Sequence, residues 1–301
     1  MKKVLKWAGI FVAGLVGLIV IAVIAVYVIT EIHLNQTYQI QPETVAVPTD
    51  EEAIAEGKRL AVSRGCGDCH GQDLSGTIFI DAGPIGRLVA SNLTAGQGGV
   101  GGKYSDADFI RAIRHGVRPN GKPLLFMPAQ EFYHLNDADL GKIIAYIKSL
   151  PPVDNQLPAS TVGPLGRVLY LTGQMALLPA ELIDHNAPRP TGVTPGETVE
   201  YGQYLAVGCS GCHGPGYSGG PIPGTPPEFP PAANITPDET TGIGNWSKAD
   251  FVKALREGKR PDGTDINPFM PWKNFSQMTD QEVGALWLYL QTVPPKAKGG
   301  R

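Results

Sequence analysis

The sequence predicts a mainly α-helical protein in which one transmembrane helix precedes two tandem copies of a small helical domain. Residues 7–30 form an uninterrupted run of 24 uncharged, mostly apolar residues. Beyond this run, distinctive residues recur at a fixed offset of 143 positions. Helix caps recur with them, whereas no alternating apolar and polar run is long enough to form a substantial sheet.

The apolar run from Trp7 to Thr30 is long enough to cross a bilayer as a helix, which needs about 20 residues. A secretory signal peptide has a shorter apolar core and a small-residue cleavage site. We therefore expect an uncleaved anchor over residues 1–31. Basic flanks stay on the cytoplasmic side of a membrane, and three lysines precede the run: Lys2, Lys3 and Lys6.

The rest of the chain consists of two similar halves. Four pairs of residues share the offset of 143 positions: Cys66 and Cys209, Met127 and Met270, Tyr146 and Tyr289, Pro151 and Pro294. Other blocks match with shifts of one or two residues, such as Leu60-Ala-Val and Leu205-Ala-Val. We expect a first domain over residues 49–152, a linker over 153–193 and a second domain over 194–296.

Each half is expected to contain three helices. Cap and stop signals place them, in the first and second half respectively, near 49–60 and 196–206, 105–116 and 247–258, and 137–150 and 280–293. Ser105 and Ser247 each precede an aspartate by three residues, as in a capping box. A Pro-Pro pair follows the last helix of each half and stops it.

The linker contains an apolar segment, Leu165 to Leu178, whose single charge is Arg167. Fourteen residues are too few to span a bilayer. We expect a helix buried between the two domains. Docking to a membrane partner or to the lipid interface is the alternative.

All four cysteines lie in two Cys-x-x-Cys-His pentads, residues 66–70 and 209–213, and this pentad is the attachment signature of c-type haem. Thiols three residues apart lie on one side of a helical turn, where both reach the vinyl groups of one porphyrin edge. A disulfide or zinc site would need further partner residues. We expect two covalently bound haem c groups, attached through Cys66, Cys69, Cys209 and Cys212, with His70 and His213 as iron ligands.

Two methionines are candidates for the sixth iron ligand. Met127 follows His70 by 57 residues, and Met270 follows His213 by the same interval. The matched interval favours axial ligation over core packing. Because His/Met ligation closes the iron to substrates, it predicts one-electron transfer.

The remaining histidines have no such pattern. His115 and His134 lack histidine counterparts in the second half, and we expect them, with His33 and His185, at the surface or beside propionates. The carbonyls of Pro84 and Pro231 are candidates to accept a hydrogen bond from the ligand histidines.

Compartment and charge agree with this interpretation. In bacteria, c-type haem is attached outside the cytoplasmic membrane, so both domains are expected in the periplasm of a single-pass protein of that membrane. Without the three N-terminal lysines, 22 basic residues face 28 acidic ones. This excess of negative charge excludes nucleic acid as a partner.

These residues resemble the class I cytochromes c, and specifically the membrane-anchored cytochrome c subunits of periplasmic alcohol, aldehyde and gluconate dehydrogenases. The resemblance rests on Cys-x-x-Cys-His-Gly, on Asn92-Leu-Thr and Asn234-Ile-Thr-Pro, on Met-Pro, and on a last helix that ends in Pro-Pro. It implies two tandem cytochrome c domains, each with three helices around a haem. Those subunits typically carry three haem domains and a C-terminal anchor, whereas this chain has two domains and an N-terminal anchor.

We therefore expect a membrane-tethered di-haem c-type cytochrome, not itself an enzyme. It would transfer single electrons between a periplasmic donor and a respiratory or photosynthetic acceptor. The alternative is a permanent electron-transfer subunit of a periplasmic dehydrogenase or oxidase complex. A di-haem peroxidase is disfavoured, because its two haems should differ in ligation, whereas these two sites match.

Overall fold

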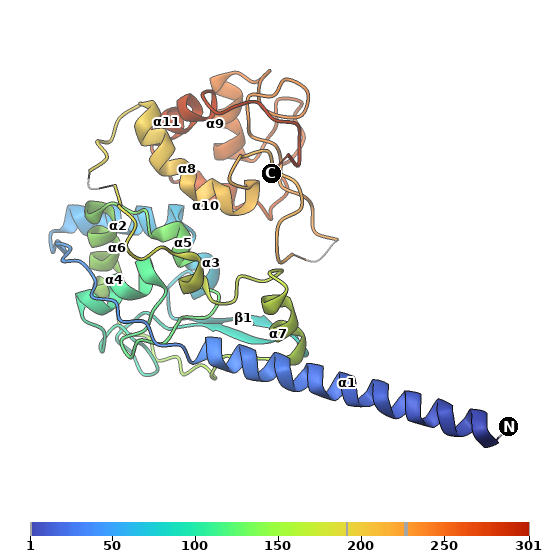
Figure 1. Ribbon diagram of the computed structural model, residues 1–301. Helices are drawn as coiled ribbons and strands as arrows, with labels where there is room; N and C mark the ends of the chain where they lie inside the picture. The colour runs from blue at the N-terminus through green and yellow to red at the C-terminus, as the bar shows by residue number, and fades with distance from the viewer. Residues whose placement is uncertain (1, 191, 226–227, 301) are drawn as a thin grey trace.

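The computed structural model describes residues 2–190, 192–225 and 228–300. Residues 1, 191, 226 and 227, which the expected anchor, linker and second domain include, lie outside the described ranges. In Figure 1 a long N-terminal helix projects from two helical lobes, and the lobe that follows it in the chain lies nearer to it.

The projecting helix is α1 (Lys2–Leu34). Within the described residues, α1 alone is long and apolar enough to cross a membrane, with a mean hydropathy of 3.0 over its most apolar window. No part of that window is covered by the rest of the protein. This exposure is compatible with a single-pass membrane anchor, in which lipid would cover the apolar side chains.

The first lobe contains five helices and most of a small sheet. Its helices are α2 (Glu51–Ser63), α3 (Cys66–His70), α4 (Asp106–His115), α5 (Ala129–Phe132) and α6 (Asp137–Ser149). Strand β2 (Gly86–Ala90) lies between β1 (Thr77–Asp81) and β3 (Thr161–Val162), and both pairings are antiparallel. These strands are short, so the fold is mainly helical, as predicted.

The second lobe repeats the helices, and its described residues, 194–225 and 228–300, form no strand. Its helices are α8 (Val199–His213), α9 (Lys248–Glu257), α10 (Trp272–Phe275) and α11 (Asp280–Leu290). α8 runs continuously into the second pentad, whereas Gly65, with φ 74°, separates α2 from α3 in the first copy. Both expected capping boxes form, from Ser105 with Asp108 and from Ser247 with Asp250.

Two glycines explain how the first and last helices of each lobe cross. A Cβ atom on Gly57 of α2 would lie 1.9 Å from the carbonyl oxygen of Lys142 in α6. A Cβ atom on Gly202 of α8 would lie 2.0 Å from the carbonyl oxygen of Ala285 in α11. Because no side chain fits at these distances, glycine lets the two helix backbones pack directly against each other.

The linker differs from the prediction. Its helix, α7 (Pro164–Leu171), is shorter than the expected 165–178 segment, and it ends before Gly173, which has φ 71°. The chain continues to a 3-10 turn, η1 (Pro179–Leu182). α7 packs against α1 and β2, so the expected burial between the two domains is wrong.

The two lobes meet through equivalent residues. Arg59 donates to Glu282 over 2.7 Å, and the Tyr204 hydroxyl donates to Asp139 over 2.6 Å. In the repeat, Arg59 corresponds to Tyr204 and Glu282 corresponds to Asp139. The lobes are thus related by a pseudo-two-fold axis, and the interface has the reciprocal contacts of an isologous dimer within one chain.

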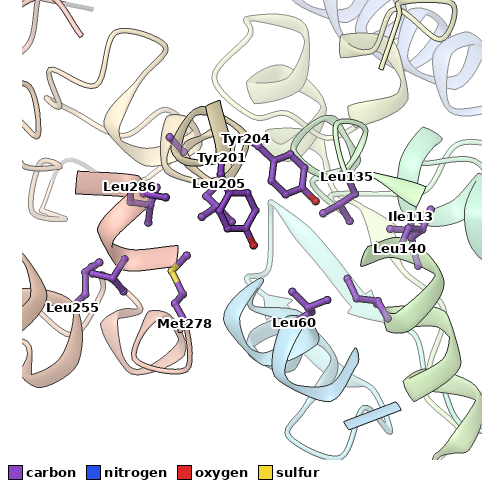
Figure 2. Close-up of a cluster of buried hydrophobic side chains, with 14 of the residues drawn as sticks. Leu60, Ile113, Leu135, Leu140, Tyr201, Tyr204, Leu205, Leu255, Met278 and Leu286 are labelled. Atoms are coloured by element: carbon purple, nitrogen blue, oxygen red, sulfur yellow. The ribbon is translucent and has the colours of Figure 1, made fainter. Parts of the chain in front are cut away.

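The apolar core continues across this interface. Figure 2 shows Leu60, Leu135 and Leu140 of the first lobe approaching Tyr201, Tyr204 and Leu205 of the second. These side chains belong to one buried cluster. Burial of apolar surface therefore holds the two copies together as one unit.

Candidate haem-binding sites

The pentads lie on α3 and at the end of α8, and their cysteines and histidines line two pockets. Cys66 and Cys69 lie one turn apart on the short helix α3, and Cys209 and Cys212 lie one turn apart at the end of α8. Residues three apart share a helix face. Each pentad therefore presents both thiols to the same pocket.

The first pocket brings together the four predicted residues of the first copy, Cys66, Cys69, His70 and Met127. Apolar side chains from the strands and from α4 and α6 form the rest of its wall, including Phe79, Leu88, Phe109, Ile113, Ile143 and Ile147. This apolar lining suits a haem, which is a flat apolar macrocycle with one polar edge.

The second pocket brings together the four predicted residues of the second copy, Cys209, Cys212, His213 and Met270. Its apolar wall includes Leu205, Ile235, Phe251, Leu255, Leu286 and Leu290. Tertiary structure thus places each methionine in the same pocket as the histidine that precedes it by 57 residues.

The histidines of both pentads are oriented by a backbone carbonyl. Nδ1 of His70 lies 2.8 Å from the oxygen of Ser91, and Nδ1 of His213 lies 2.7 Å from the oxygen of Ala233. The prediction that Pro84 and Pro231 supply these carbonyls is wrong. A hydrogen bond at Nδ1 leaves Nε2 as the nitrogen for iron and fixes the ring's orientation.

The Asn-x-Thr motif explains why these carbonyls are in place, and sequence reasoning had not assigned it a role. Asn92 follows Ser91 directly; its Oδ1 accepts from the backbone N–H and the hydroxyl of Thr94. Its Nδ2 donates to the oxygen of Val153 over 2.8 Å. In the second copy, Asn234 follows Ala233 and makes the same contacts. The motif therefore ties the histidine's partner loop to the end of its domain.

The four thiols fit covalent attachment. Burial raises the pKa of Cys66 to about 12 and that of Cys69 to about 11. Burial likewise raises the pKa of Cys209 to about 12. These three thiols therefore stay uncharged at neutral pH, which suits a thioether in an apolar pocket better than the thiolates that a zinc site would need.

The two pockets share a wall. Five residues of the first lobe line both: Arg64, Gly65, Cys69, Glu131 and Phe132. Nη2 of Arg64 is buried without a hydrogen-bond partner, and burial raises the pKa of Glu131 to about 7. Sequence reasoning missed both, because Arg64 lies in a two-residue insertion of the first copy and Asn274 holds the position of Glu131, so no repeat signal marks either residue.

Each lobe also touches the pentad of the other. Oε1 of Glu131 lies 2.3 Å from the position that a Cβ atom on Gly211 would take. Asn274, which corresponds to Glu131, donates to Asp68, which corresponds to Gly211, over 2.6 Å. The pentads therefore face each other across the pseudo-two-fold axis.

The remaining histidines do not join these sites. His115 is only 2% exposed, so its expected surface position is wrong. Its Nδ1 lies 3.0 Å from Nδ1 of His185, and neither residue lines a haem pocket.

Comparisons with known proteins agree with this geometry. The sequence pattern of the cytochrome c family matches residues 54–151 and 199–294. The fructose dehydrogenase cytochrome subunit of Gluconobacter japonicus is 28% identical over 83% of this chain and 54% of its own length. The gluconate 2-dehydrogenase cytochrome c subunit of Pantoea cypripedii is 37% identical over 34% of this chain and 25% of its own length.

A third relative, a diheme cytochrome c-type protein of Cereibacter sphaeroides, is 39% identical over 21% of this chain and 21% of its own length. The chain spans about half the length of the relatives that it matches most extensively. Two family matches and two equivalent pockets lead to one assignment. The chain belongs to the cytochrome c family and carries two covalently bound haem c groups, one in each copy.

Proposed function

We propose that this protein is a membrane-tethered di-haem c-type cytochrome that transfers single electrons between a periplasmic donor and a respiratory or photosynthetic acceptor. The observation that carries this proposal is the equivalence of the two pockets together with the wall that they share. The two pockets contain the same types of candidate ligand. This equivalence is typical of an electron carrier rather than of an active site.

In this proposal Cys66 and Cys69 hold one haem, and Cys209 and Cys212 hold the other. His70 and Met127 bind the first iron, and the corresponding residues of the second copy, His213 and Met270, bind the second. Haem c supplies an iron that takes up and releases one electron at a time. The apolar walls exclude water, so the surroundings change little when the charge on the iron changes.

The chain's own contribution to transfer is the arrangement of its pockets. Cys69 lines both of them, and Phe132 is the aromatic residue of the shared wall. Haems held by the two pentads would both border this wall, at a separation set by the interface between the lobes. A fixed interface keeps this separation constant, so transfer within the chain needs no encounter between molecules.

The proposed location is the bacterial cytoplasmic membrane. α1 crosses it with Lys2, Lys3 and Lys6 on the cytoplasmic side, and both haem domains lie in the periplasm. A permanent place in a dehydrogenase complex is the second candidate, favoured by relatives that are named as cytochrome subunits of such enzymes.

Two measurements test the proposal. The detergent-solubilised protein should show only low-spin haem c by electron paramagnetic resonance and should not turn over peroxide. A high-spin component at either haem, or peroxidase turnover, would contradict closed His/Met ligation. Purification from native membranes then separates the two candidates, because a complex subunit co-purifies in fixed ratio with a catalytic chain.

A further inference from the structure

The linker helix α7 has an apolar face that the described structure leaves partly exposed. Leu165, Val168 and Leu171 follow one another at intervals of three, and their side chains are 44%, 42% and 37% exposed. Residues at this spacing share one helix face. Exposed apolar side chains that gather on one face usually mark a contact surface.

The opposite side of α7 is packed against the first lobe. A Cβ atom on Gly166 would lie 2.2 Å from the carbonyl oxygen of Ile85, so this turn of the helix touches the backbone beside β2. Leu169 packs on a separate buried cluster that includes Leu88, Leu177 and Leu178. The exposed face is therefore additional to the face that the fold uses.

A third side of α7 is fixed to α1. Arg167 donates to the Thr30 hydroxyl over 2.5 Å and to Glu31 over 2.6 Å, and its guanidinium lies 4.4 Å from the centre of the Tyr27 ring. Thr30 is fully buried by this contact. Figure 1 shows α7 beside α1, on the side of the lobe from which α1 projects.

These contacts show at which level along the axis of α1 the helix α7 lies. Trp7 and Tyr27 are 20 residues apart in one helix, a rise of about 30 Å, which is the thickness of the hydrocarbon core of a bilayer. Tryptophan and tyrosine are enriched at the two membrane interfaces. Arg167 therefore meets α1 at the level of the headgroups.

We propose that α7 is an interfacial membrane helix whose face of Leu165, Val168 and Leu171 inserts into the lipid around α1. This inference rests on the proposed membrane anchoring by α1. Lipid is the occupant because α7 packs against α1, the proposed anchor, at the headgroup level, and because the face of Leu165, Val168 and Leu171 carries no charge. The first haem domain is then held against the bilayer at two places and keeps one orientation toward a membrane-bound partner.

Photo-crosslinking in vesicles tests this proposal. Benzoylphenylalanine replaces Val168 in the full-length, haem-loaded protein, which is reconstituted in phosphatidylcholine and phosphatidylethanolamine vesicles and irradiated. We expect the peptide that contains position 168 to gain the mass of a phospholipid, with a yield comparable to that from the same probe at Phe11 in α1. Position 171 serves as a second probe on the same face.

The probe at the exposed Lys253 of α9 is the matched control and should give no lipid adduct. Lipid adducts at position 11 but not at 168 or 171 would overturn the role of α7 while leaving the anchor intact. Failure at position 11 as well would refute the anchor itself. In native membranes, an adduct of position 168 with another protein instead of lipid would also overturn the proposal.

Discussion

At the scale of single residues, the two copies orient the pentad histidine through equivalent hydrogen bonds. A haem iron needs an imidazole in one orientation, and Asn92 fixes the loop whose carbonyl at Ser91 sets it. Asn92 is 1% exposed, so its hydrogen bonds have no water to replace them. Asn234 does the same in the second copy.

Substitution of Asn92 by alanine should therefore destabilise the first domain. The change leaves the buried backbone N–H of Thr94 without its acceptor and removes the shorter of the two hydrogen bonds of the Thr94 hydroxyl, at a cost of about 1–3 kcal/mol. Urea unfolding followed by haem absorbance measures this cost. Gln156→Ala, at an exposed site on the loop that follows Val153, is the control, and an equal effect of the two substitutions would contradict the assigned role.

The methionines carry the assignment of the sixth ligand. Met127→Ala or Met270→Ala should open one iron, lower the potential of that haem and add a high-spin signal, because the thioether favours the ferrous state. Potentiometric titration and electron paramagnetic resonance measure both effects. Met175→Ala is the control: Met175 is also buried but lies outside both pockets, so its loss should affect stability and leave the spectra unchanged.

At the scale of elements, the end of α4 anchors both segments that enter and leave the first domain. Arg114 pairs with Asp137 over 2.5 Å and with Glu43 over 3.3 Å, and Arg189 of the linker pairs with the same glutamate over 2.7 Å. His115, the last residue of α4, lies between this cluster and His185. A buried polar cluster of this kind resists protonation of its imidazoles.

This cluster predicts a loss of stability in acid. Burial lowers the pKa of His115 to about 4. The attraction of Glu43 raises this pKa, whereas repulsion from His185, Arg189 and Arg114 lowers it further. Burial also lowers the pKa of His185. The folded pKa lies below the unfolded value of 6.5, so this contribution is complete above pH 6.5 and is lost as the pH falls toward 4.

Unfolding in urea at a series of pH values between 7 and about 4 measures this loss. The variant His115→Gln should show a smaller decline of the free energy of unfolding over this interval than the unsubstituted protein. His134→Gln, which changes a histidine outside the cluster, is the control. A decline that is identical in all three proteins would contradict the role of His115.

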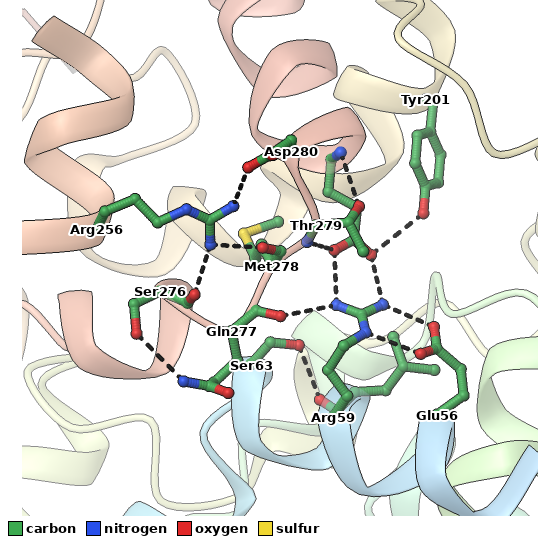
Figure 3. Close-up of polar contacts among 12 residues, drawn as sticks. Glu56, Arg59, Ser63, Tyr201, Arg256, Ser276, Gln277, Met278, Thr279 and Asp280 are labelled. Atoms are coloured by element: carbon green, nitrogen blue, oxygen red, sulfur yellow. Dashed lines mark hydrogen bonds and ion pairs between the residues drawn. The ribbon is translucent and has the colours of Figure 1, made fainter. Parts of the chain in front are cut away.

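At the scale of the whole molecule, the interface between the lobes decides that this is one two-centre unit rather than two tethered domains. Figure 3 shows Arg59 bonded to Glu56 of its own helix and, across the interface, to the carbonyl of Gln277. Arg59 also donates to Glu282 across the same interface. The side chain of Glu282 is 4% exposed. A carboxylate buried this far needs its partner, because water does not reach it.

Replacement of Arg59 by leucine should therefore cost about 3–5 kcal/mol and loosen the contact between the lobes. A second substitution, Glu282→Gln, should restore much of this loss, because it removes the unpaired charge and keeps the capping box of α11. Urea unfolding of the single and double variants tests the coupling. Arg87→Leu, which breaks an exposed pair with Asp81, is the control and should cost less than about 1 kcal/mol.

Much of this protein follows from the sequence, because it is set by local chemistry. The anchor follows from an apolar run, the helices from caps such as Ser105 and Ser247, and the haems from two pentads. The repeat adds information that one copy alone would lack: two matched intervals of 57 residues pick Met127 and Met270 out of five methionines.

Only the tertiary structure decided the rest. The carbonyls of Ser91 and Ala233 carry no side-chain signal, and the burial of His115 depends on segments 70 residues away. The place of α7 depends on Arg167 meeting Thr30 across 137 positions of sequence. The sequence by itself determined two haem sites of equal chemistry, because ligands are read from residue type and spacing. The two sites face each other because surfaces that are far apart in the sequence pack together, and no local sequence pattern encodes this packing.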